Sequence, residues 1–361
     1  MPSALRLTAG LLRASSRAYA NAVVQKLQAA RPGMMEDALP ASFASPVSDI
    51  DVRLQQIAAS LLVDRPALLA DVLAWYRVAF HHRGVHADYL PATLQAIEST
   101  LQDELPRAAF ASLRAHLAAA TEGLDSRPFE LPSHLDKQAP HGELAIRFLL
   151  ANLEGRGDEA VRMVEQARAD GAPIEELHDH VLVPVQQETG RMWLMGEIGV
   201  RDEHYGSEIV ERVLSMLQFY VPVAGADAPR VVLFGATGDH HDLGQRLVAQ
   251  RLQVGGFRVH NIGADLPAHE LDGVLRDHAC DLVAISATML LHVPALVEQL
   301  RALRAAMLDV FGDEQARPVI VGGPPFRVVE DLHEAIGADA SAKDAASAVE
   351  VARRLLARDP G

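Results

Sequence analysis

DHHDLG, residues 239–244, directly follows the apolar run VVLF at residues 231–234 and precedes a helical pattern. A histidine in such a loop can reach a metal ion. A carboxylate two residues earlier can accept a hydrogen bond from the other ring nitrogen, which fixes the tautomer and raises the ligand's basicity. The stretch therefore offers His241 as a metal ligand and Asp239 as its orienting group. The same residues also fit a polar loop that caps the helix beginning near Leu243.

Downstream of this stretch, short apolar runs alternate with helical patterns. Such alternation predicts a parallel sheet with helices on both faces. The predicted strands are residues 230–235, 257–262, 281–286, 318–322 and 338–340, and the predicted helices are residues 243–254, 268–278, 293–308, 328–336 and 345–356. We therefore expect a five-stranded α/β domain of the Rossmann-like, flavodoxin type over residues 229–361.

Polar and small residues follow two further predicted strands. Ser286 and Thr288 come after the third strand, and Gly322 and Gly323 come after the fourth. Ligands of open parallel sheets bind over the carboxyl ends of the strands, where the strand order reverses. Ser286 could instead be a strand-end cap, and the two glycines could be a tight turn. Three strand ends that converge on one crevice favour a binding site.

The order D-x-H-x-x-G, then S-x-T, then G-G resembles the cobalamin-binding domains of methionine synthase, methylmalonyl-CoA mutase and their relatives. The resemblance implies that the metal is cobalt, that His241 is its lower axial ligand and that Asp239 orients this histidine. It also implies a buried nucleotide tail lined by the other motif residues, which are Gly244, Ser286, Thr288, Gly322 and Gly323. The spacing from Thr288 to Gly322 is longer than in these domains, and a polar loop at residues 309–317 accounts for the excess.

Residues 140–223 carry helical patterns without a strand signal, which predicts a four-helix bundle. Within it, Trp193 is followed after nine residues by the pair Glu203-His204. This arrangement resembles the light-sensing cobalamin photoreceptors typified by CarH. The resemblance implies that the bundle covers adenosylcobalamin through Trp193, Val200, Glu203 and His204. Trp193 also fits a bundle core, and Glu203-His204 fits a helix N-terminal pair.

Two features depart from those photoreceptors. They have a histidine after the cap tryptophan, where this chain has Leu194, so a second histidine ligand after illumination is doubtful. They also begin with a DNA-binding domain of the MerR type, and residues 1–130 show no such pattern. With 48 acidic and 33 basic residues the net charge is −15, which argues against direct nucleic-acid binding.

Residues 49–125 predict a further helical domain with a dense group of rings: Trp75, Tyr76, Phe80, His81, His82, His86 and Tyr89. The group fits either a core with a solvated histidine turn or a second ligand pocket. The layout resembles the photocobilins, which implies biliverdin as a second chromophore. Because the single cysteine, Cys280, lies before a predicted strand, such a bilin would be held without a covalent bond.

The first 48 residues predict a helix and a linker. Residues 1–31 contain five basic residues and no acidic one, which fits a transit peptide or, as we expect, an exposed amphipathic helix that packs on a partner subunit. Prolines mark residues 34–48 as a linker. One cysteine fits a reducing cytoplasm, and the chain has no apolar run long enough to predict a membrane span.

Together these patterns predict an adenosylcobalamin-dependent light sensor rather than an enzyme. Loss of the adenosyl group would shift the bundle and change a homo-oligomer interface or the interface with a protein partner that carries the output. Two alternatives use the same pocket. One is a corrinoid methyl-carrier protein of a methyltransferase system, and the other is a cobalamin sensor that does not respond to light.

Overall fold

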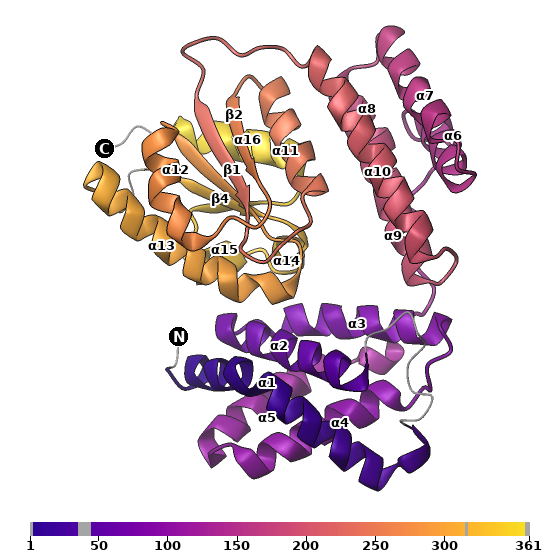
Figure 1. Cartoon of the computed structure of the whole chain (residues 1–361), viewed down its shortest axis with the longest axis vertical. Helices are drawn as coiled ribbons and strands as arrows, with labels where there is room; N and C mark the ends of the chain where they lie inside the picture. Colours follow the sequence, from indigo (N-terminus) through magenta and orange to yellow (C-terminus); the bar gives the residue numbers. More distant parts are fainter. Residues whose placement is uncertain (1–2, 35–44, 315–316, 358–361) are drawn as a thin grey trace. The chain divides into compact units, whose positions relative to one another are not determined.

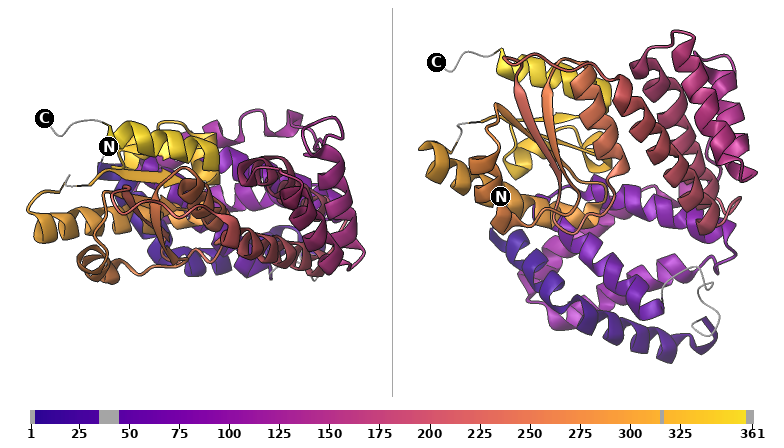
Figure 2. Two further views of the ribbon diagram at one scale, coloured as in Figure 1. Left: turned by 90° about the horizontal axis from the view of Figure 1, so that it is seen from above. Right: turned by 45° about the horizontal axis from the view of Figure 1, so that its top comes forward.

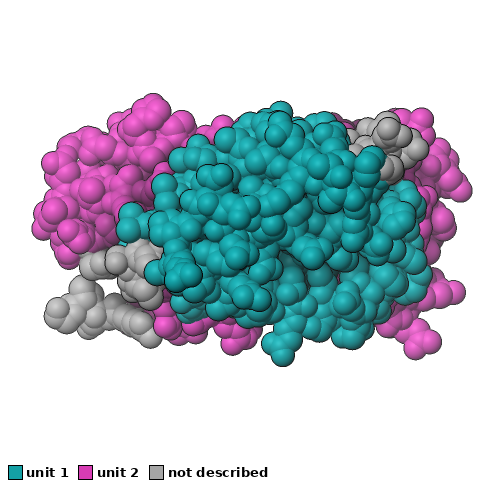
Figure 3. Space-filling model, turned by 90° about the horizontal axis from the view of Figure 1, so that it is seen from below, with its two compact units in different colours: residues 1–130, 289–294 teal, residues 131–288, 295–361 magenta. Residues whose placement is uncertain are grey.

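The computed structural model describes residues 3–34, 45–314 and 317–357, which form two compact units (Figures 1 and 3). Unit 1 comprises residues 1–130 and 289–294, and unit 2 comprises residues 131–288 and 295–361. Most of the predicted linker at residues 34–48 falls outside the described residues. None of the helices in the described part of the chain combines the length and low polarity that a membrane span needs.

Unit 1 is built from five helices. They are α1 (Ser3–Ala30), α2 (Pro46–Val63), α3 (Pro66–His82), α4 (Tyr89–Glu104) and α5 (Arg107–Thr121). Pro46 and Pro66 occupy the first turns of α2 and α3, where the fixed φ of proline suits the helix and its missing N–H costs nothing. The short helix η6 (Leu290–His292), from the second segment of unit 1, contacts α2 and α3.

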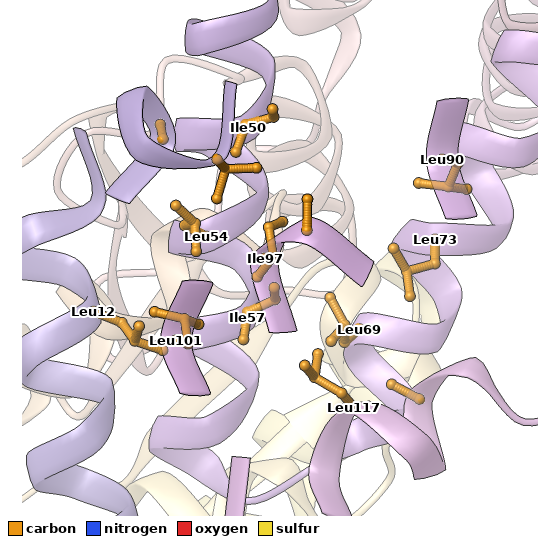
Figure 4. Close-up of a cluster of buried hydrophobic side chains, with 14 of the residues drawn as sticks. Leu12, Ile50, Leu54, Ile57, Leu69, Leu73, Leu90, Ile97, Leu101 and Leu117 are labelled. Atoms are coloured by element: carbon orange, nitrogen blue, oxygen red, sulfur yellow. The ribbon is translucent and has the colours of Figure 1, made fainter. Parts of the chain in front are cut away.

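The core of unit 1 is a cluster of hydrophobic side chains drawn from all five of these helices (Figure 4). Helix α1 contributes Ala9, Leu12, Ala20 and Val23, each fully buried. The expectation that residues 1–31 form an exposed helix is therefore wrong. Its apolar stripe packs mainly against α2 inside the same unit, so the stripe needs no partner subunit to cover it.

A buried ion pair ties the helices of unit 1 together. The guanidinium of Arg53, which is fully buried, lies 2.9 Å from the carboxylate of Asp49 and donates to Thr93 Oγ1 at 3.2 Å. Tyr89 donates its hydroxyl to Asp49 at 3.1 Å. The Tyr76 ring lies 4.7 Å from the guanidinium carbon. Helices α2, α3 and α4 are thus joined around two charges that water does not reach.

Unit 2 begins with the expected helical bundle. Its helices are α6 (Gly142–Leu153), α7 (Gly157–Ala169), a continuous run of α8 (Ile174–Leu177), the π-helical turn η3 (His178–Leu182) and α9 (Val183–Leu194), and α10 (Val200–Leu217). Phe148, Leu177, Val213 and Leu217 are fully buried in its core. Gly196, with φ +71°, and Gly199 lie in the turn between α9 and α10.

The rest of unit 2 is a five-stranded parallel sheet in the order β2-β1-β3-β4-β5. The strands are β1 (Arg230–Gly235), β2 (Arg258–Gly263), β3 (Leu282–Ser286), β4 (Val319–Gly322) and β5 (Ala340–Ala342). Helices α11 (Leu243–Val254) and α16 (Ala345–Leu356) pack side by side on one face, and α12 (Leu271–Asp277) and α13 (Val293–Phe311) lie on the other (Figures 1 and 2). The predicted fold class is confirmed, and the order reverses between β1 and β3.

Three predicted elements differ from the structure by more than one residue. The last strand begins at Ala340 because Gly337 is left-handed and the Ala338 amide donates to the His333 carbonyl, so these two residues end the preceding helix. The helix expected at residues 328–336 is two short helices, α14 (Pro324–Val328) and α15 (Leu332–Ile336). Part of the polar loop expected at residues 309–317 is the end of α13, and residues 315–316 lie outside the described ranges.

We predict that Asp49→Asn destabilises unit 1 by about 3 kcal/mol or more, because it leaves the Arg53 charge buried without its counter-charge. The measurement is urea unfolding followed by Trp75 fluorescence in a Trp193→Phe background. Asp103→Asn is the matched control, since the Lys26–Asp103 pair is exposed and its loss should cost less than about 1 kcal/mol. Equal effects of the two changes would contradict the structural role of the buried pair.

Candidate functional site

A buried carboxylate organises the loop after β1. Asp239 is 2% exposed, and its Oδ1 accepts hydrogen bonds from the backbone N of His241 at 3.1 Å and from His241 Nδ1 at 2.9 Å. Its Oδ2 accepts from the backbone N of Thr288 at 2.6 Å. One side chain thus joins the exits of β1 and β3, the two strands at which the sheet order reverses.

The imidazole of His241 is held by this carboxylate and projects from the sheet edge. Its side chain is 58% exposed. The hydrogen bond to Asp239 raises the pKa of His241, and partial burial opposes the shift. With Nδ1 protonated and donating to Asp239, the basic ring nitrogen is Nε2. Within the described ranges no group of three or more His, Cys, Asp or Glu side chains is placed to hold a free metal ion.

The glycine directly after β4 occupies a position that excludes a side chain. Gly323 has φ +116°, and a Cβ there would lie 2.0 Å from the carbonyl oxygen of Ala287. The Ala287 amide donates to the Gly322 carbonyl at 3.0 Å, and Ser286 pairs with Gly322 in the ladder. The exits of β3 and β4 are therefore in backbone contact, as the sequence pattern required.

A cavity of about 380 Å³ opens at these strand ends and runs between the sheet and the helices α11 and α16. It is lined by six of the predicted site residues, which are His241, Gly244, Ser286, Thr288, Gly322 and Gly323. Its inner wall is apolar, with Leu233, Ala284 and Ile320 from the strands and Leu252 and Ala348 from the two helices. Helix–sheet interfaces are normally close-packed, so an unfilled volume here is suited to a ligand.

The sequence reasoning missed the polar residues that line the cavity from other elements. Gln186 and Gln187 line it from α9 in the bundle, Arg327 comes from α14, and Lys343 precedes α16. The two adjacent glutamines in an amphipathic helix could have indicated a polar contact with a ligand. The two basic residues could not have been identified from the sequence, because only the strand order brings their segments to the sheet edge at which β1 and β3 end.

The four residues expected to cover the ligand lie around the turn between α9 and α10, and they do not line this cavity. Glu203 is paired with His204 at 2.6 Å and accepts from the Ser207 hydroxyl at 2.9 Å. Ser207 in turn accepts from Gln186 at 2.7 Å, so a chain of hydrogen bonds links Glu203 to the cavity wall. Val200 is 55% exposed.

Helix α11 joins the bundle to the sheet. Its buried Gln250 accepts a hydrogen bond through Oε1 from His178 Nε2 at 2.8 Å and donates one through Nε2 to the Leu214 carbonyl at 2.8 Å. Arg251 pairs with Asp179 at 2.9 Å. Burial lowers the pKa of His178 to about 4, so its ring is neutral at physiological pH. The helix that follows the His241 loop is therefore fixed to the bundle by polar contacts of buried and partly buried groups.

Both parts of unit 2 match known domain families. Residues 229–352 match a family described as B12 binding domain, and residues 145–218 match a second family with the same description. The chain carries B12-binding domains. Neither match reaches residues 1–144.

The chain is similar to several curated corrinoid proteins. Dimethylamine corrinoid protein 3 of Methanosarcina acetivorans is 28% identical over 201 residues, which cover 55% of this chain and 90% of that protein. The dimethylamine corrinoid protein of Methanosarcina barkeri is 26% identical over 220 residues, covering 60% and 98%. The solved monomethylamine corrinoid protein of Methanosarcina barkeri shares the fold, with a TM-score of 0.52, 23% identity and 59% and 99% coverage.

These relatives overturn the functional prediction made from the sequence. The chain was expected to be an adenosylcobalamin light sensor, with a bilin as a possible second chromophore. Its relatives, however, are named as dimethylamine corrinoid proteins, so the light-sensor prediction is wrong. The spacing of Trp193 and Glu203-His204 misled the interpretation, because such a spacing within a helical bundle does not specify which form of a corrinoid a protein binds.

We predict that Gly323→Ala destabilises unit 2 by at least about 2 kcal/mol, since the backbone there is open only to glycine and the new Cβ meets a carbonyl oxygen. Gly244→Ala is the matched control. Its Cβ would meet nothing within 4 Å, and alanine in a helix is as stable as glycine or more so. Urea unfolding followed by Trp193 fluorescence, in a Trp75→Phe background, measures both. A stable Gly323→Ala protein would contradict the described backbone.

Proposed function

We propose that this chain is a corrinoid methyl-carrier protein of a methyltransferase system. The observation that carries the proposal is the Asp239–His241 pair at the mouth of the cavity between the sheet, α11 and α16. It lies in the stretch that matches a B12 binding domain. The names of the relatives support the methyl-transfer role.

The residues present fit a corrinoid. An apolar cavity with polar groups at its mouth suits the cofactor's nucleotide tail, and the closely packed Gly322-Gly323 backbone forms one side of the entrance. The corrin macrocycle would already hold the cobalt ion, so the protein would need to supply only one nitrogen ligand, and His241 would be that ligand. When bound, the corrinoid supplies the cobalt that accepts and releases the methyl group.

The chain's own residues hold and orient this ligand. Asp239 accepts the Nδ1 proton of His241, which fixes the ring and increases the basicity of Nε2. The Thr288 amide donates to the same carboxylate, so Asp239 is ordered before any cofactor binds. We assign Ser286, Thr288 and Gly244 to the tail site.

The bundle would cover the other face of the corrinoid. We keep Trp193, Val200, Glu203 and His204 as candidate residues for that face, since Glu203 connects to the cavity wall through Ser207 and Gln186. A methyl carrier must expose its cofactor in turn to the proteins that load and unload it. The partner that we propose is therefore a methyltransferase. The bundle is the part of unit 2 that would move when this partner binds.

We predict that His241→Ala loses the axial nitrogen. The protein is loaded with hydroxocobalamin and reduced to the cobalt(II) state, and its electron paramagnetic resonance spectrum is recorded. The wild-type spectrum should show superhyperfine splitting from one axial nitrogen, because the imidazole coordinates cobalt. Isotopic labelling of histidine with nitrogen-15 should change the splitting.

His240→Ala is the matched control, since His240 is the neighbouring residue and its side chain is 79% exposed. It should keep the splitting and its isotope shift. A change of the splitting on histidine labelling that persists in His241→Ala would contradict the ligand assignment, because the cofactor's own base can supply only unlabelled nitrogen. Asp239→Asn should keep the ligand but weaken cofactor binding by about 10- to 100-fold, as expected for an orienting partner of a metal ligand.

The methyl-carrier role is tested by loading the protein with cobalamin, reducing it chemically, and adding mono-, di- or trimethylamine or methanol with extract of the producing organism. One donor should return the absorption spectrum of the methylated cofactor faster than in free cobalamin. His241→Ala should lose this advantage. If no donor methylates the bound cofactor faster than the free one, the methyl-carrier proposal fails, whether or not cobalamin binds.

A further inference from the structure

Unit 1 contains a second cavity, which the B12-binding matches do not reach. It has a volume of about 650 Å³ and lies among α3, α4, α5 and the segment Leu124–Phe129. Small-molecule sites typically have volumes of about 300 to 1,000 Å³. The histidine and aromatic cluster noted in the sequence contributes Phe80, His81 and His86 to its lining.

One side of the cavity is apolar and rigid. Phe80, Val85, Leu90, Leu117 and Leu124 line it and are buried in the core of unit 1. These side chains belong to one packed hydrophobic core, so the wall is formed before any ligand arrives. Such a surface is suited to a ring system or an acyl chain.

Aromatic rings form another part of the lining. The ring of Phe129 stacks on His81 with centroids 3.9 Å apart and lies 3.7 Å from the guanidinium carbon of Arg77. The Phe129 carbonyl accepts a hydrogen bond from His82 Nε2 at 3.0 Å. Three residues of α3 thus hold Phe129, so the ring is fixed in place at the edge of the cavity.

Arg77 is the polar anchor of the cavity. Its guanidinium donates to the backbone carbonyls of Asp125, at 2.9 Å, and Arg127. These partners are neutral, so they leave its charge uncompensated, and a guanidinium carries more N–H donors than the two used here. Arg114, by contrast, is paired with Glu98 at 3.1 Å. A planar carboxylate is the group that a guanidinium binds best.

We propose that this cavity binds a compact amphipathic carboxylate, with its apolar part between Phe129 and the buried wall and its carboxylate on Arg77. The chain carries a net charge of −15, which opposes binding of an anion at a general surface site. Inside the cavity, the positive charge of Arg77 offsets that repulsion. This inference concerns unit 1 alone and does not rest on the methyl-carrier proposal.

The test is isothermal titration calorimetry of the full chain loaded with hydroxocobalamin, with 2-naphthoate, decanoate and 2-naphthamide as probes. At least one carboxylate should bind with a Kd below about 100 µM, and 2-naphthamide should bind at least about tenfold more weakly than 2-naphthoate. The same titration without cobalamin should give the same values. If neither carboxylate shows saturable binding, the proposal is overturned.

Two variants locate the site. Ala118→Trp places a ring in the cavity, since Ala118 is exposed and lines it, and carboxylate binding should be lost. Ala119→Trp is the matched control, because Ala119 is exposed on the same helix outside the lining, and it should bind as the wild type does. Equal binding by both variants overturns the location.

A third variant tests the chemical class. Arg77→Gln keeps donors for the two carbonyls but removes the charge, so it should weaken 2-naphthoate by at least about tenfold and leave 2-naphthamide unchanged. Equal weakening of both probes would reduce the site to an apolar cavity and overturn the carboxylate assignment. Circular dichroism and thermal unfolding confirm that each variant is folded, and Arg77→Gln decides the outcome if Ala118→Trp does not fold.

Discussion

The carboxylate of Asp239 is the interaction on which the site of unit 2 depends. It is buried at the point where the sheet order reverses, and it accepts hydrogen bonds from the residue two positions along its own loop and from the first turn after β3. A buried carboxylate requires such partners, because an uncompensated charge in the interior costs several kcal/mol. The same bonds that satisfy it fix the imidazole of His241, so the requirement of the fold and the requirement of the proposed metal ligand coincide.

Helix α11 connects the His241 loop to the bundle. It begins directly after the His241 loop, lines the cavity along one side, and meets the bundle through Gln250 and Arg251. Displacement of the bundle would break hydrogen bonds of buried groups as well as apolar contacts with Leu247. Movement of the bundle away from α11 would therefore cost free energy. If the bundle covers the cofactor, as proposed above, this cost would keep it closed. Such a cover would be expected where a cofactor is shielded from solvent and exposed only to a partner.

Much of the sheet and its site could be predicted from the sequence. The apolar runs placed four strands to within one residue and the last strand two residues too early. The motif residues at the ends of β1, β3 and β4 do meet at one edge, because parallel strands end on the same side. The burial of α1 could not be predicted, since an amphipathic stripe does not say whether its cover lies in the same chain. Nor could the spacing of Trp193 and Glu203 identify what the bundle covers, and the light-sensor interpretation failed for that reason.

The sequence by itself determined the α/β order, the histidine with its carboxylate, and the glycines at the fourth strand end, because each depends on local pattern or on residue chemistry. Only the tertiary structure decided that α11 and α16 leave a cavity against the sheet and that Gln186 and Lys343 reach it. It also decided that Arg77 rests on backbone carbonyls beside Phe129 in a second cavity. Cavities are the volume that packing leaves unfilled between distant segments, and no local pattern records that volume.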